Sequence, residues 1–207
     1  MPDFYHSDVN FLVLHTLRCL GFTTLARIAE ATGLSESDAQ SELIDLAVDK
    51  LVSNVPGDFG GWGLTDAGRA ADAERAAAEL DKAGARPAVA ATFEKFMVLN
   101  PELLDLCTAW QTRTVDGVMT PNDHADSRYD ARVLDRLSDF HDRALVVCGE
   151  LTAALPRFQR YERQLGRALA RAKAGEGQYV ADDTASYHTI WFQLHEDLLV
   201  TQGIPRH

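Results

Sequence analysis

Three stretches of sequence decide the fold: TLARIAEATGLS at residues 24–35, DKLV at 49–52 and GWGLTDAGRA at 61–70. Apolar residues recur at helical spacing over 8–20, 24–32 and 35–51, and Gly21 and Gly33 stand where the first two helices would end. Ser35, with Asp38 three residues later, is a capping-box-like helix start. Two short apolar segments around the Gly-rich residues 56–61 predict a hairpin, and Thr65 opens an Ala-rich helix. The predicted order is three helices, a hairpin and a helix.

This order, with the three stretches in sequence, resembles the winged helix-turn-helix of MarR-like bacterial regulators. Residues 24–35 are similar to the helix-turn-helix, residues 49–52 to the entry into the wing, and residues 61–70 to the exit into the next helix. The resemblance covers roughly residues 8–80. It implies a winged-helix domain at 1–80 and a separate domain at 81–207 for dimerisation or ligand binding.

The remainder of the chain is predicted to be all helix. We expect helices at 88–99, from Pro101 to 110, from about 129 to Pro156, from there to 174, and at 185–200, with a polar loop at 112–129. This half resembles the C-terminal half of uncharacterised winged-helix regulators common in actinobacteria, through residues 122–130, 157–161 and 187–197. The expected fold class is therefore mainly α: an N-terminal winged helix-turn-helix with a small hairpin wing, then a helical bundle.

The composition and charge of the chain argue against several classes of protein. The chain has 207 residues, 46% of them apolar, which is enough to build a core, and no apolar run long enough to cross a membrane. Three cysteines without a CxxC pair predict buried free thiols and a cytoplasmic protein. The net charge is −11, which counts against nucleic-acid binding because such proteins usually carry a basic face. Residues 151–175 are the exception, with six Lys/Arg against one acid.

The helix at 35–51 is the predicted recognition helix, yet its outward positions are mostly acidic. Side chains that read bases are usually Arg, Lys, Asn or Gln, and an acid beside a phosphate adds repulsion. If DNA is bound, the expected contacts are Arg27, Ser37, Gln40, Ser41, Lys50 and Arg69. The first hypothesis is a homodimeric bacterial transcriptional regulator that binds DNA. The alternative is a winged-helix adaptor that binds a protein partner through its acidic face and does not bind DNA.

A stripe of arginines and a set of aromatic residues are the candidate ligand site. The arginines at 157, 160, 163, 167 and 171 fall within about one third of a helix circumference. They are either a solvated face, a site for a phosphate-bearing ligand or nucleic-acid backbone, or a dock for the acidic face of the winged helix. The aromatic residues are either core or the wall of an apolar pocket for a small effector, with an anionic effector among the alternatives. The expected ligand contacts are Trp110, Arg157, Arg160, Arg167, His188, Trp191 and His195.

No catalytic, metal or cofactor site is predicted. The chain has no GxSxG, HExxH, P-loop or GxGxxG motif, so we expect neither an enzyme nor a cofactor. FadR-type regulators bind metal in their effector domains with one Asp and three His. Here Leu137 stands four residues before His141, where that Asp would be needed, so no metal is expected.

Overall fold

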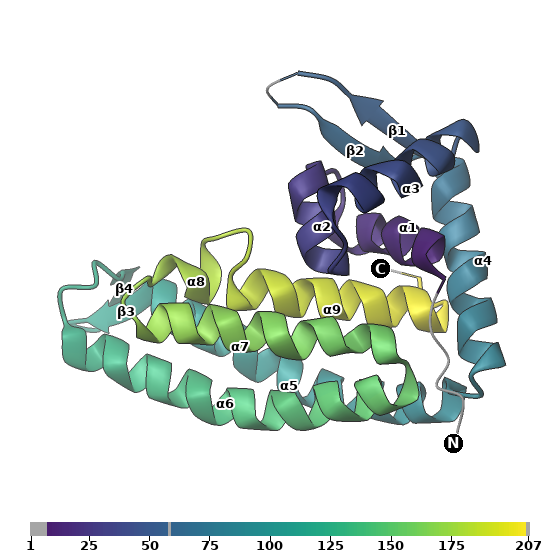
Figure 1. Cartoon of the computed structure of the whole chain (residues 1–207). Coiled ribbons are helices and arrows are strands. Elements are labelled where there is room, and N and C mark those ends of the chain that lie inside the picture. The colour runs from purple at the N-terminus through teal and green to yellow at the C-terminus, as the bar shows by residue number, and fades with distance from the viewer. Residues whose placement is uncertain (1–7, 58, 206–207) are drawn as a thin grey trace.

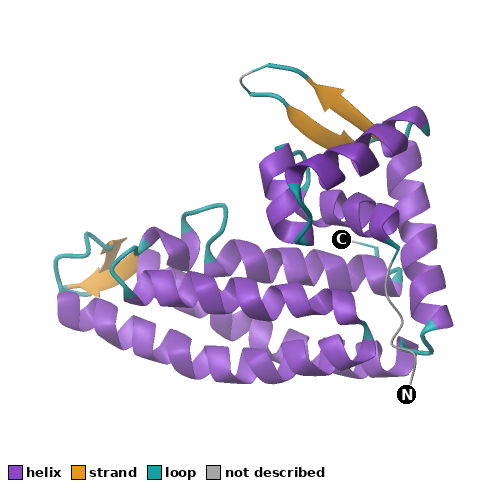
Figure 2. Ribbon diagram, viewed as in Figure 1, coloured by secondary structure: helices purple, strands orange, loops and turns teal. Residues whose placement is uncertain are grey.

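The chain is mainly helical, with two small two-stranded antiparallel sheets, in the computed structural model, which describes residues 8–57 and 59–205 (Figures 1 and 2). Residues 8–82 form a first unit, which we call the N-terminal unit. Its elements are α1 (Val9–Leu20), α2 (Leu25–Thr32), α3 (Glu36–Val48), β1 (Val52–Val55), β2 (Gly61–Leu64) and α4 (Asp66–Lys82). The predicted order of three helices, a hairpin and a helix is therefore confirmed.

Local capping explains where these helices begin and end. The Ser35 hydroxyl accepts the backbone N–H of Asp38 and donates to the Asp38 carboxylate over 2.7 Å, which satisfies an otherwise free donor at the start of α3. Thr65 caps α4 in the same way by accepting the N–H of Gly68. Gly33 ends α2 in the left-handed region, with φ of 76°, where a side chain would be strained. Each of these ends lies where the sequence predicts it.

The second unit, residues 86–205, is called the helical unit. Its elements are α5 (Arg86–Gln111), β3 (Thr112–Val115), β4 (Val118–Pro121), α6 (Ser127–Ala154), a 3-10 turn η1 (Pro156–Phe158), α7 (Gln159–Lys173), α8 (Gln178–Ala181) and α9 (Tyr187–Gln202). The break expected at Pro156 is confirmed. The break expected before Pro101 is wrong, because α5 runs through this residue without interruption. Packing along α6 outweighs the one backbone hydrogen bond that proline cannot donate.

The expected loop at 112–129 is also wrong over its first half, so the second part of the chain is not all helix. Strands β3 and β4 pair antiparallel, with Val115 opposite Val118. The turn between them is Asp116-Gly117, and both residues have positive φ, 51° and 82°. An Asp-Gly turn with two positive φ angles is the tight turn that joins twisted strands. Asp126 then caps α6 by accepting the N–H groups of Arg128 and Tyr129.

Each unit has an apolar core of its own, but the cores are not isolated: Leu80 of α4 belongs to the larger one, and Phe11, Ala76 and Val200 form a small cluster between the units. Helices α5, α6, α7 and α9 lie side by side around Phe96, Phe140, Phe158 and Trp191, while the smaller core of the N-terminal unit is built around Leu14 and its neighbours (Figure 1). The N-terminal unit rests on one end of α9 through α1 and α4, and the β1–β2 hairpin points away from the helical unit. The three cysteines are buried and unpaired, as expected.

Gly68 provides a direct test of the packing at the start of α4. A Cβ atom there would lie 1.9 Å from the Leu51 carbonyl oxygen, whereas a Cβ at Gly149, on the exposed face of α6, would meet nothing within 4 Å. We expect Gly68→Ala to lower the free energy of unfolding by about 3 kcal/mol. Gly149→Ala should raise it by about 0.5–1 kcal/mol, because alanine favours the helix. Urea denaturation followed by circular dichroism measures both, and equal effects would contradict the packing.

Candidate functional site

A network of buried charges joins the two units. In the N-terminal unit, His15 on α1 lies fully buried between two carboxylates: its Nδ1 is 2.8 Å from Oδ1 of Asp72 on α4, and its Nε2 is 3.0 Å from Oδ1 of Asp197 on α9. Asp197 is itself fully buried. One histidine therefore ties α1 and α4 to the last helix of the helical unit.

Arg157 brings a second bridge from the turn before α7. Its Nε donates to Oε2 of Glu79 on α4 over 2.6 Å, its Nη1 donates to Oδ1 of Asp197, and its Nη2 donates to the hydroxyl of Thr201 over 2.5 Å. The break at Pro156 makes this geometry available, because Arg157 stands in the 3-10 turn and not in α7 itself. Each of the three guanidinium nitrogens therefore donates a hydrogen bond to a different residue.

Arg160, in the first turn of α7, completes the network. Its Nη1 donates to the Thr16 hydroxyl over 2.8 Å, and its Nη2 donates to the Tyr161 hydroxyl over 2.7 Å and to Oδ2 of Asp197 over 2.9 Å. The Tyr161 hydroxyl also donates to this Asp197 oxygen over 2.8 Å. Both oxygens of Asp197 are thus held by cations and hydroxyl groups from α1, η1, α7 and α9.

We call His15, Asp72, Glu79, Arg157, Arg160 and Asp197 the seam. Its formal charges sum to zero when His15 is protonated. Two guanidiniums face the carboxylates of Glu79, Asp72 and Asp197, so a third positive charge makes the sum zero. A neutral imidazole has one N–H donor and would turn a lone pair toward one of its two carboxylates, whereas an imidazolium donates to both. Geometry and charge therefore agree on the imidazolium form of His15.

The pKa directions are consistent with this balance. Burial acts to lower the pKa of His15, as does Arg157, but Cys19, Asp197 and Asp72 act to raise it, and the result lies well above the ordinary value. Burial alone would raise the pKa of Asp197, but Arg157, His15 and Arg160 hold it well below its usual range. The network is an ionised cluster that water does not reach.

A metal ion does not fit this cluster, although ligand-type atoms meet in it. Within the described ranges, His15, Cys19 and Asp197 each offer an atom within 4.8 Å of the others. Both carboxylate oxygens of Asp197 already accept from a guanidinium, and the imidazolium directs N–H groups, not lone pairs, at its neighbours. A cation placed here would meet three positive charges.

The expected arginine stripe is not one surface, so the ligand role expected for Arg157 and Arg160 is wrong as a surface role. Both side chains are buried and engaged in ion pairs with their own chain, so an external anion does not reach them, although Nε of Arg160 makes no hydrogen bond. Arg167 is exposed, and its Nη1 lies 2.9 Å from Oε1 of Glu30 on α2. Arg157 and Arg167 pair with Glu79 and Glu30 of the N-terminal unit. Among the described residues, none of these arginines pairs with an acid of α3, so the contacts are not the dock expected for the acidic face of the winged helix.

The expected aromatic and histidine contacts fall into two places. Trp191 stacks on Phe96 with ring centroids 4.4 Å apart, and His195 packs against the same ring at 5.2 Å, so this group belongs to the core. Trp110 lies at the β3–β4 end, 4.6 Å from the His124 ring. His188 is half-buried on α9. These residues do not line one pocket.

Four of the six expected DNA contacts lie on α3 or directly after it. Ser37, Gln40, Ser41 and Lys50 are all exposed, and Lys50 follows α3 in the left-handed region with φ of 60°. The other two are placed elsewhere: Arg27 donates to the Thr184 carbonyl of the helical unit, and Arg69 lines a hollow beside Glu196 on α9. Arg27 and Arg69 are therefore placed beside the helical unit and not on the face of α3.

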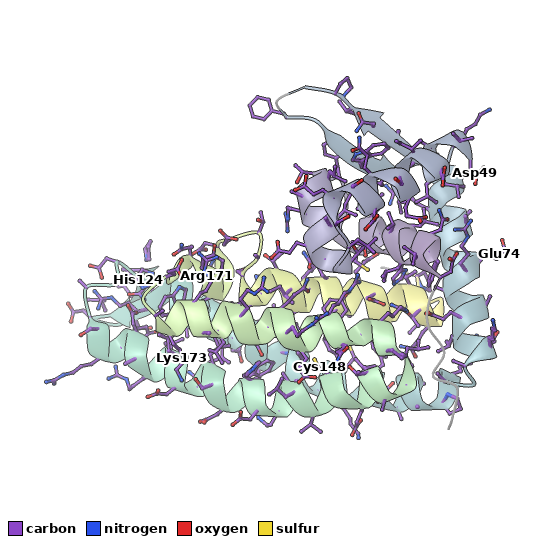
Figure 3. All side chains as sticks on the ribbon, in the orientation of Figure 1. Asp49, Glu74, His124, Cys148, Arg171 and Lys173 are labelled. Carbon is purple, nitrogen blue, oxygen red and sulfur yellow. The ribbon has the colours of Figure 1, made fainter. Side chains whose placement is uncertain are left out.

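Acidic and apolar side chains dominate the exposed face that remains. Ile44 and Val48 on α3 are 51% and 74% exposed, and Phe59 at the hairpin tip is 97% exposed. Asp49 ends α3 near the base of the hairpin (Figure 3). We call the following residues the α3–hairpin face: Glu36, Ser37, Asp38, Gln40, Ser41, Ile44, Asp45, Val48, Asp49, Lys50, Val55 and Phe59.

Sequence reasoning missed the residues that carry the seam: His15, Asp72, Glu79 and Asp197. One signal was available, because His15 lies within LVLHTL on the apolar side of its predicted helix, where a charged group needs a buried partner. The identity of that partner is not local information, since Asp197 is 182 residues away.

Comparison of the chain with family models, curated proteins and solved structures finds no match. Across residues 8–57 and 59–205, no helix combines the length and the apolar character that crossing a membrane requires.

Breaking the seam is expected to be costly. Asp197→Asn keeps the shape of the side chain but leaves Arg157 and Arg160 without their shared charge, so the free energy of unfolding should fall by about 3–5 kcal/mol. Arg143→Met is the matched control, because Arg143 forms an exposed pair with Glu102 and should cost less than about 1 kcal/mol. Urea titration at pH 7 measures both, and similar small losses would show that the seam contributes little.

The charge on His15 predicts a pH dependence. Its folded-state pKa lies above the unfolded value, so its contribution is fully present below about pH 6.5 and is lost as pH rises through the folded pKa. While the folded chain retains this proton and the unfolded chain has lost it, stability should fall by about 1.4 kcal/mol per pH unit. Urea midpoints between about pH 6.5 and 8.5 measure the slope, and His15→Gln should flatten it. An unchanged slope in the variant would contradict a protonated His15.

Proposed function

We propose that this chain is a cytoplasmic regulatory protein in which the N-terminal unit is a winged helix, with β1–β2 as its wing, and the helical unit is the bundle that positions it. The order of elements and the resemblance of residues 24–35, 49–52 and 61–70 to MarR-like proteins support this assignment. The proposed working surface is the α3–hairpin face, which points away from the helical unit.

The partner that this face fits best is a protein. The proposal rests on the composition of this face. Its centre is apolar, because Ile44 and Val48 are exposed there, and Lys50 is the cation among its described residues. The acids around this centre are Glu36, Asp38, Asp45 and Asp49. Acids beside a phosphate backbone weaken binding, because no counterions are released. Exposed apolar side chains inside a charged rim are typical of a protein interface. The proposed role is that of an adaptor whose partner carries a basic, apolar surface.

A DNA-binding transcriptional regulator is the second candidate. One observation favours it: Ser37, Gln40, Ser41 and Lys50 lie together on the exposed side of the helix that would enter the major groove. In this candidate, DNA affinity would rest on few phosphate contacts and would depend weakly on salt.

Two double variants separate the candidates. Ile44→Ser with Val48→Ser removes the apolar centre of the face, while Ser41→Glu with Lys50→Glu removes the groups suited to DNA. For the adaptor, the first variant should weaken capture of the partner at least tenfold, whereas the second, which makes the face more acidic, should not weaken capture of a basic partner. Val118→Ser, an exposed apolar change on β4, is the control. Quantitative pull-down from source cells measures retention, with genomic DNA fragments tested in parallel at low salt.

The opposite pattern would contradict the adaptor. Enrichment of one or a few palindromic DNA sites, lost in Ser41→Glu with Lys50→Glu and retained in Ile44→Ser with Val48→Ser, would establish the DNA-binding regulator instead.

The homodimer expected from the sequence is also kept as a proposal. The face of α5 and α6 that presents Val98 and Val146, 79% and 60% exposed, is the proposed contact, since a two-fold interface uses one self-complementary patch. Light scattering after size exclusion should give twice the chain mass, and Val98→Glu should give a monomer. A monomeric wild type at high concentration would contradict it.

A further inference from the structure

A pocket opens where the N-terminal unit meets the helical unit, beside the buried seam. Its volume is about 240 Å³. Leu20, Arg27 and Glu30 line it from α1 and α2, and α7, α8, the loop before α9 and α9 itself supply the opposite wall. An occupant would therefore touch both units at once.

The lining of this pocket is positively charged in a chain of net charge −11. It contains three arginines and one acid, Glu30, which pairs with Arg167. Arg171 pairs with Glu176 and lies over the Tyr179 ring, 3.6 Å from its centroid. Among the described residues, Arg27 pairs with no carboxylate, since its one hydrogen bond is from Nη2 to the Thr184 carbonyl over 2.9 Å. This leaves a guanidinium at the pocket whose charge is not balanced locally.

A second, independent feature points to a ligand. Gln193 on α9 is only 8% exposed and lines the pocket, yet within the part of the chain that the structure describes its side-chain amide makes no hydrogen bond. The amide is not sealed from solvent at the pocket, so its donor and acceptor are open to an occupant. Such a group is expected to meet a polar group that enters the pocket.

The rest of the wall is suited to a short apolar body. Leu20, Ala168 and Ile190 contribute methyl and methylene groups between the polar side chains. Most ligand pockets have volumes of about 300–1,000 Å³, so a pocket of 240 Å³ suits a ligand smaller than a typical drug.

We propose that this pocket binds a small organic monocarboxylate. Its carboxylate is held by the guanidinium of Arg27, its short apolar body lies along Leu20 and Ile190, and a second polar group of the ligand meets the amide of Gln193. The ligand stabilises the arrangement in which the two units are docked, because it contacts both of them. The inference deepens the proposed function by giving the regulatory protein an effector, and it is tested without any DNA or protein partner.

The experiment measures binding by the full chain, using nuclear magnetic resonance and calorimetric titration. The probes are propanoate, butanoate, 3-hydroxybutanoate and benzoate, each compared with its methyl ester. We expect saturable binding of at least one acid with a Kd of about 1 mM or lower, and at least tenfold weaker binding of its uncharged ester. Shifted resonances should come from Leu20, Gln193 and their neighbours.

Variants locate the site. Arg27→Gln and Gln193→Leu should each weaken binding of the acid at least tenfold. Arg163→Gln, an exposed change on α7 outside the pocket, should leave binding within twofold and controls for general charge. Thermal unfolding confirms that each variant is folded. For a variant that does not fold, saturation-transfer contacts between the acid and wild-type Leu20 and Ile190 provide the same test.

Three results would overturn the proposal: no saturable binding of any of the acids, equal binding of an acid and its ester, or equal loss in Arg163→Gln and Arg27→Gln. Each is independent of the partner experiments, so the pocket and the adaptor role can fail separately.

Discussion

The two units are held in one arrangement by buried charges between them, which must balance one another because water does not solvate them there. Three carboxylates, on α4 and α9, are balanced by one imidazolium from α1 and two guanidiniums from η1 and α7. An isolated buried charge costs several kcal/mol, so neither unit can keep its half of the network ionised and dry alone. The docked arrangement is therefore more than the sum of two apolar cores.

The same balance of charge divides the residues that hold the two units together from the residues left to recognise a partner. Arg157 and Arg160 form ion pairs within the seam, and Arg27 and Arg167 bind at its edge, so each of these four cations contacts the other unit, although Arg167 itself stays exposed. What is left on the α3–hairpin face is acidic and apolar. One arrangement of charge thus explains a rigid joint, a positively lined pocket at its edge, and an outer face suited to a partner other than DNA.

Local signals predicted much of the fold and little of the site. Capping at Ser35, the glycine at position 33 and the break at Pro156 act within a few residues, and each was predictable. The Asp116-Gly117 turn was also a local signal, but it was overlooked within a polar stretch. The seam was not predictable, because helical periodicity places Arg157 on the face of α7, whereas the 3-10 turn directs it toward Glu79, 78 residues earlier.

The distance along the chain between the partners of His15 has a consequence for synthesis. Asp72 follows it by 57 residues, but Asp197 follows by 182. Translation adds about 5–20 residues per second. Roughly 10–35 seconds therefore pass between the synthesis of His15 and that of Asp197, the carboxylate that hydrogen-bonds to its second ring nitrogen. Once α4 is made and until α9 arrives, His15 and Glu79 lack their partners from the helical unit, and water must solvate them there. Folding of the N-terminal unit on the ribosome therefore ends late, when α9 arrives and displaces that water.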